Sequence, residues 1–228
     1  MRYLDQENGM TFVEIIIAVT LAAIIVTILA QFYSNALLDY GRTETKTQLQ
    51  QNTRQAVDTL ARDIKAAISV ESPNHWPDSH SPTSPSNNYG WQSTSGSSAT
   101  LVMAVPSRDT NDGLLYIDSL HNALQTDDVV YYINSANKIL YRRVIANPVA
   151  GNAALTSCPP GQTSSSCPAD ANVVEDVADL TITYFDLNNN VTTPTNSVLL
   201  EITLKQTRVR NGRTLTSSYT TRVGLRNK

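Results

Sequence analysis

A run of apolar residues near the N-terminus constrains the fold of this 228-residue chain more than any other feature. It covers residues 10–30 and contains a single charged residue, Glu14. As an α-helix, the run would be roughly 30 Å long, which matches the hydrocarbon core of a bilayer. Because the run is apolar on all sides, it suits lipid or the interior of a helix bundle. We therefore predict a transmembrane or assembly helix at residues 10–30.

The residues on either side of the run argue against an ordinary secretory signal. Such a signal has a basic stretch, a shorter apolar core and small residues at a cleavage site beyond the core. Here the small residue, Gly9, stands before the run, and Gln31-Phe32-Tyr33 follows it.

Glu14 is the unusual residue of this segment. A carboxylate within an apolar span costs several kcal/mol unless it finds a partner. Two interpretations are open. Glu14 is either a helix-start residue in the membrane interface, favoured by the helix dipole, or a carboxylate with a specific cationic partner.

Residues 9–18 (GMTFVEIIIA) resemble the prepilin signature of type IV pilins and type II secretion pseudopilins. The resemblance implies that a prepilin peptidase cleaves after Gly9, removes residues 1–9 as a leader and methylates the new terminal amine of Met10. It also implies that Glu14 of one subunit pairs with the terminal amine of a neighbour. The chain departs from the usual pattern at Met10, where phenylalanine is commoner, and in its acidic leader residues Asp5 and Glu7.

The helical pattern continues beyond the apolar run. We predict an amphipathic continuation over residues 31–68, with a bend or loose turn at 41–47, where helix formers are poor. Pro73 is expected to end the pattern, and a Ser/Pro-rich loop is expected at 69–98. The apolar stripe consists of Leu49, Thr53, Ala56, Val57, Leu60, Ile64, Ala67 and Ile68.

From residue 99 onward, alternating patterns and short apolar runs predict a β-rich globular head at 99–228. The predicted fold class is therefore α+β, with a long N-terminal helix packed on a mostly antiparallel sheet of about seven strands. The segment 174–186 is expected to be a short helical turn that runs into a strand. The predicted strands are 101–105, 114–117, 129–133, 139–145, 177–187, 198–209 and 215–225.

Three parts of the head resemble PilW-type minor pilins and the related J-type pseudopilins. They are the hairpin at residues 129–143, the segment 174–186 and the C-terminal strand at 221–227. The resemblance implies a pilin-like head in a minor subunit rather than in a major pilin.

The chain has two cysteines, Cys158 and Cys167, which bracket a loop rich in Pro, Gly and Ser. In an exported head they are expected to form a disulfide, the alternative being two free thiols. We expect Trp76 and Trp91 to pin the 69–98 loop to the head. The segments 109–113 and 186–190 are expected to be turns, because neither has the ligand spacing of a calcium loop.

Composition and motifs narrow the function. The formal net charge is −3 and the pI about 5.6, so no basic excess suggests nucleic-acid binding. No nucleotide, nucleophile-elbow or metalloprotease motif occurs, and we expect neither an enzyme nor a bound cofactor or metal.

The resemblance implies a minor type IV pilin that helps to initiate a pilus or sits at its tip. Its implied partners are other minor and major pilins, the prepilin peptidase and the inner-membrane assembly platform. The chain would cross the inner membrane once with a periplasmic head, and would then reach the cell-surface pilus. Two alternatives stay open: a J-type minor pseudopilin of a type II secretion system, and a membrane-anchored periplasmic enzyme or receptor.

Overall fold

The computed structural model describes residues 11–116 and 124–225. Gly9 and Met10, the predicted cleavage and methylation residues, lie outside this range. The chain forms two compact units, residues 1–45 and 46–228.

The helix α1 extends over Phe12–Ala66. The bend predicted at residues 41–47 is wrong, because this segment is helical throughout. Its threonines satisfy their hydroxyl groups inside the helix: Thr43 Oγ1 donates to the Asp39 carbonyl, and Thr45 Oγ1 donates to the Gly41 carbonyl. Low intrinsic propensity costs only a few tenths of a kcal/mol per residue, so the cooperative helix ladder continues through it.

The end of α1 is set by the sheet and not by Pro73. The Ala67 amide still donates to the Asp63 carbonyl, but the Ile68 amide donates to the Ala104 carbonyl. The chain thus leaves the helix when its backbone begins to pair with a strand, several residues before Pro73.

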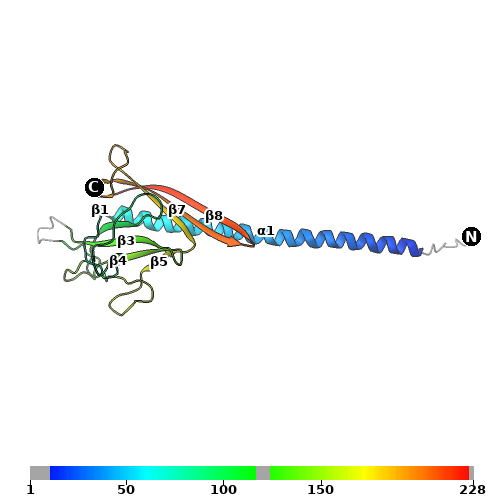
Figure 1. The fold of residues 1–228 in the computed structure, drawn as a ribbon, viewed down its shortest axis with the longest axis horizontal. Coiled ribbons are helices and arrows are strands. Elements are labelled where there is room, and N and C mark those ends of the chain that lie inside the picture. The colour runs from blue at the N-terminus through cyan, green and yellow to red at the C-terminus, as the bar shows by residue number, and fades with distance from the viewer. Residues whose placement is uncertain (1–10, 117–123, 226–228) are drawn as a thin grey trace, which may run out of the picture. The chain divides into compact units, whose positions relative to one another are not determined.

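The second unit contains two antiparallel sheets (Figure 1). The five-stranded sheet has the order β1-β2-β3-β4-β5, and the three-stranded sheet has the order β6-β7-β8. The strands are β1 Ser69–Val70, β2 Leu101–Pro106, β3 Thr126–Asn134, β4 Ile139–Ile145, β5 Ala171–Val174, β6 Val177–Phe185, β7 Leu199–Arg210 and β8 Arg213–Gly224, with a short 3₁₀ helix η1 at Pro194–Asn196.

This arrangement confirms the predicted α+β class, and it differs from the expected strands in three places. Of the strand expected at 114–117, Leu114 and Tyr116 make isolated bridges to Arg108 and Leu124, and residue 117 lies outside the described residues. The short strands β1 and β5 were not expected, because two and four residues are too short for a periodic pattern. The segment 174–176 is not a helical turn: Val174 ends β5, and Asp176 has a φ of 58°.

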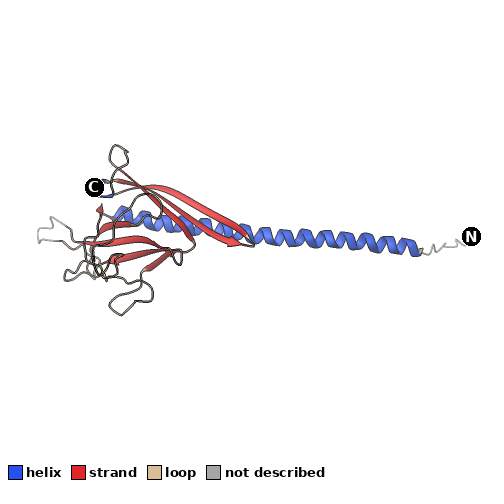
Figure 2. Cartoon of the chain, in the orientation of Figure 1, coloured by secondary structure: helices blue, strands red, loops and turns tan. Residues whose placement is uncertain are grey.

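The main core lies between the C-terminal part of α1 and both sheets (Figure 2). It joins Leu60 and Ile64 of α1 to Tyr131 of the five-stranded sheet and to Ile202 of the three-stranded sheet. The five-stranded sheet is also buried on its other face. There Val102, Val130 and Ile145 form a second cluster with Trp91 of the 69–98 loop. The loop therefore acts as an additional layer over this sheet.

Candidate functional site

The start of α1 places Glu14 in a reciprocal hydrogen-bonded cap. The Thr11 amide and the Thr11 hydroxyl donate to Glu14 Oε2 at 2.9 and 3.0 Å, and the Glu14 amide donates to Thr11 Oγ1 at 3.3 Å. This is the capping-box arrangement, in which residues three apart satisfy each other's free groups at a helix start. The geometry agrees with the helix-start interpretation of Glu14.

The apolar part of α1 has the physical properties of a membrane span. The described residues contain one helix long and apolar enough to cross a bilayer, and its most apolar 18-residue window has a mean hydropathy of 2.8. The polar side chains in this window keep their hydrogen bonds within the helix. Thr20 Oγ1 donates to the Ile16 and Ile17 carbonyls, and Thr27 Oγ1 donates to the Ala23 carbonyl. No polar group of these threonines is therefore left unsatisfied in lipid.

The head contains a buried ionic cluster that the sequence analysis missed. Arg143 of β4 is fully buried. Its Nε and Nη2 donate to the two carboxylate oxygens of Asp78 at 2.7 and 2.8 Å, and its Nη1 donates to Asp170 at 3.0 and 3.2 Å. Asp78 belongs to the 69–98 loop, whereas Asp170 follows the disulfide loop. One guanidinium group thus fixes two loops to the same face of the sheet.

Further hydrogen bonds complete this cluster. Trp91 Nε1 donates to Asp78 Oδ2 at 2.6 Å, and the hydroxyls of Tyr132 and Ser157 donate to Asp170. Burial opposes the ionisation of Asp78, but the hydrogen bonds from Arg143, the His80 amide and Trp91 outweigh it and hold the pKa of Asp78 below its usual range. The sequence of β4 could have indicated the burial of Arg143. In a strand, every second side chain lies on the same face, so Arg143 shares a face with Tyr141 and Ile145, which are buried.

Another buried carboxylate, Asp128 of β3, forms no ion pair with any residue that the structure describes. Its Oδ2 accepts the amides of His75 and Trp76 at 2.6 and 2.9 Å. Among the described residues, Oδ1 has no hydrogen-bond partner. Burial raises the pKa of Asp128 to about 6, against the opposing effect of the two amides. Trp76 also donates through Nε1 to the Thr126 carbonyl, so the 69–98 loop is pinned to β3 at this point.

The cysteines form the predicted disulfide. Cys158 and Cys167 are bonded, with their Cα atoms 5.5 Å apart. The Asp170 amide donates to the Cys158 carbonyl and the Cys158 amide donates to the Pro168 carbonyl, which joins the ends of the loop a second time. The turns predicted at 109–113 and 186–190 are also present. Asp109 Oδ1 accepts the Gly113 amide, and Asp186 Oδ1 accepts the Asn190 amide.

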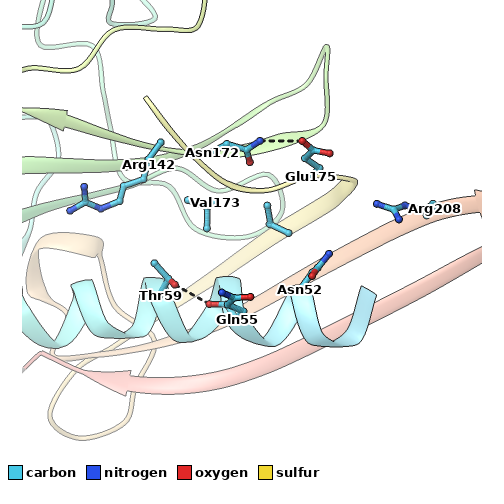
Figure 3. A pocket seen from close by; sticks show the side chains of 10 residues that line it. Asn52, Gln55, Thr59, Arg142, Asn172, Val173, Glu175 and Arg208 are labelled. Carbon is cyan, nitrogen blue, oxygen red and sulfur yellow. Dashed lines mark hydrogen bonds between the residues drawn. The ribbon is translucent and has the colours of Figure 1, made fainter. Parts of the chain in front are cut away.

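A polar groove of about 480 Å³ lies between α1 and β5 (Figure 3). Asn52, Gln55 and Thr59 of α1 line one side. The other side presents Arg142, β5 with the adjoining Glu175, and Arg208 of β7. Its charged groups already have partners: Arg142 pairs with Asp63, Arg208 with Asp176, and Glu175 accepts a hydrogen bond from Asn172. The groove lining thus consists mainly of hydrogen-bonding groups, and Glu175 is the carboxylate among them.

No protein-family model matches the chain, and no curated protein shows a significant sequence match to it. Across residues 11–116 and 124–225, no three His, Cys, Asp or Glu side chains are grouped so that they could hold a metal ion. The observations that bear on function are the capped helix start, the apolar part of α1 and the sequence of residues 9–18.

Proposed function

We propose that the protein is a minor type IV pilin, a structural subunit that is anchored by α1 and helps to initiate a pilus or occupies its tip. The observation that carries the proposal is the position of Glu14. It stands at the first turn of a membrane-length helix, directly after the segment 9–13 that resembles a prepilin cleavage site. A simple membrane anchor needs neither the glycine nor the carboxylate. The presence of both therefore favours a subunit over an anchored enzyme or receptor.

The proposed mechanism of assembly uses the helix start. Removal of residues 1–9 would create a cationic amine on Met10, close in sequence to Glu14. In a packed helix bundle, solvation of the Glu14 carboxylate by water is lost, and the amine of a neighbouring subunit can replace it. Within one chain, Glu14 Oε2 already accepts hydrogen bonds from Thr11, whereas Oε1 has no partner among the described residues. Glu14 could therefore keep its cap and still accept a neighbour's amine.

The direct test is the mass of the mature N-terminus. The protein is expressed in cells with and without a prepilin peptidase, and its N-terminal peptide is identified by mass spectrometry. We expect an N-methylated chain beginning at Met10 only when the peptidase is present. An intact Met1 terminus in the presence of the active peptidase would contradict the proposal.

A J-type minor pseudopilin of type II secretion is the second candidate, because the segments 129–143 and 174–186 resemble both groups. The two candidates share processing and fold and differ in their partner subunits. Co-purification with pilus subunits favours the first candidate, whereas co-purification with pseudopilins favours the second.

A further inference from the structure

The strand β8 forms a long free edge of the three-stranded sheet. Its 12 residues pair with β7 in one continuous register, from Arg213 opposite Arg210 to Gly224 opposite Leu199. The sheet ends at β8, and no backbone hydrogen bond joins its outer side to any other described residue.

The turn between β7 and β8 fixes which backbone groups point outward. Asn211 and Gly212 both have positive φ values, 50° and 68°, as in a two-residue type I′ hairpin. The flanking pair Arg210–Arg213 is therefore hydrogen bonded, and every second pair after it is hydrogen bonded as well. The remaining residues direct their N–H and C=O groups to the free side: Thr214, Thr216, Ser218, Thr220, Arg222 and Gly224.

This edge lacks most of the features that usually protect an edge strand, and its charged residues are Arg213 and Arg222, near its two ends. Natural edges are blunted by proline, lysine, bulges or a covering element. The segment 213–224 contains no proline or lysine, and its pairing with β7 shows no bulge. Its outward positions are mainly threonines, which favour extended backbone. The edge is thus ready to pair with another strand.

The space beside the edge is also open. A groove of about 400 Å³ runs between β8 and α1, lined by Gln50, Gln51 and Arg54 on the helix and by residues 217–219 on the strand. The Arg54 guanidinium lies over the Tyr219 ring, 5.4 Å from its centroid. A strand added at residues 217–219 would lie next to this groove and near Arg54.

Charge indicates which kind of strand fits. The strand β8 carries Arg213 and Arg222 and no acidic residue, and Arg54 is the charged residue of the groove lining. Arg222 already pairs with Glu201 at 2.6 Å, which leaves Arg54 and Arg213 to attract an incoming acid. Two copies of β8 would bring two cationic edges together without any acid on either strand. A second copy is therefore disfavoured.

We propose that the free edge of β8 binds an extended, acidic segment of a partner protein as an added β-strand. Main-chain hydrogen bonds would supply affinity, and the arginines would select acidic side chains. The inference concerns the head alone, and it rests neither on cleavage after Gly9 nor on membership of a pilus.

The test uses the full chain in detergent micelles and a blocked synthetic peptide, TEVTEVT, with TKVTKVT as the matched control. Amide hydrogen exchange is followed by NMR at each residue of β8. We expect the acidic peptide to slow exchange by about tenfold or more at Thr214, Thr216, Ser218 and Thr220, while the odd-numbered residues between them, already bonded to β7, stay unchanged. Binding through side chains alone would not produce this alternation.

A pair of variants at one outward position separates pairing from folding. Ser218→Pro removes one outward N–H without breaking a bond to β7, whereas Ser218→Ala keeps that N–H. With both variants folded, as judged by circular dichroism, we expect the proline variant to lose peptide binding and the alanine variant to retain it. The proposal is overturned if peptide addition leaves the outward amides unprotected, or if the lysine peptide protects them equally. Protection that grows with protein concentration in the absence of peptide would also overturn it, since the occupant would then be a second copy.

Discussion

Glu14 in the first unit and Asp78 in the second are both carboxylates that accept several hydrogen bonds, but their partners come from different distances along the chain. Glu14 is held by Thr11, three residues away, and remains exposed. Asp78 is buried and is held by Arg143, 65 residues away. The first arrangement stabilises one turn of helix, whereas the second determines where two loops lie on a sheet. Four predictions test this difference, in order of decreasing effect.

Replacing Arg143 should cause the largest loss of stability. Arg143→Met leaves Asp78 and Asp170 buried without a cation, which costs about 3–5 kcal/mol in unfolding free energy. The matched control is Arg142→Met. Arg142 is its neighbour on the opposite face, where the ion pair with Asp63 is partly exposed and should be worth about 1 kcal/mol or less. Urea unfolding monitored by circular dichroism measures both, and similar losses in the two variants would contradict the distinction.

Asp128 should make the stability of the head depend on pH. Because its pKa is about 6 in the folded protein and near 4 when unfolded, the folded state binds the proton more tightly. Protonation of Asp128 thereby stabilises the folded state by at most about 3 kcal/mol of unfolding free energy. This stabilisation is fully present below the unfolded pKa and is lost as the pH rises through about 6.

The variant Asp128→Asn isolates that contribution, since its amide oxygen can still accept the His75 and Trp76 amides. We expect the variant to gain stability relative to the wild type as the pH is raised from 4 to 7, as measured by unfolding at a series of pH values. A constant difference across this range would rule out Asp128 as the source. Asp78, whose pKa is lowered, acts in the opposite direction and is common to both proteins.

Breaking the disulfide should cost somewhat less. The bond closes a short loop, with a sequence separation of nine residues, and the chain-entropy estimate for such a loop is about 2–3 kcal/mol. The double variant Cys158→Ala and Cys167→Ala is compared with the wild type before and after reduction. Reduction should lower the midpoint of unfolding of the wild type only. An equal response of the variant would show that another effect of the reductant is responsible.

The smallest effect on stability is expected at the start of α1. Thr11→Ala removes the cap and should cost about 1 kcal/mol, seen as faster amide exchange in the first turn. Thr11→Ser keeps the hydroxyl and serves as the control.

If Glu14 also pairs with a neighbour's amine, Glu14→Ala should be processed normally but assemble poorly, whereas Thr11→Ala should still assemble. Co-purification with other subunits compares the two, and wild-type assembly of Glu14→Ala would leave the cap as the function of Glu14.

Structural features that depend on residues close together in the sequence were predictable. The apolar part of α1, the hairpin between β3 and β4, and the strands β7 and β8 all follow from local patterns. The position of the cysteines also predicted their bond. The aromatic residues Trp76 and Trp91 also predicted that the 69–98 loop packs on the head, which the structure confirms. The contact of Asp78 with Arg143 did not follow, because the polar composition of the loop hides it. The partners of Arg143 were likewise hidden, since 65 and 27 residues separate them from it.

The position of Arg143 between two loops has a consequence for the order of folding. The hairpin of β3 and β4 involves neighbouring segments and can form early, when Arg143 is still hydrated. Closing the contact with Asp78 requires a long stretch of chain to return, and such distant contacts are slow to form. We therefore expect docking of the 69–98 loop to be a late kinetic step, so that the newly made head passes through a state in which one face of its larger sheet is still bare.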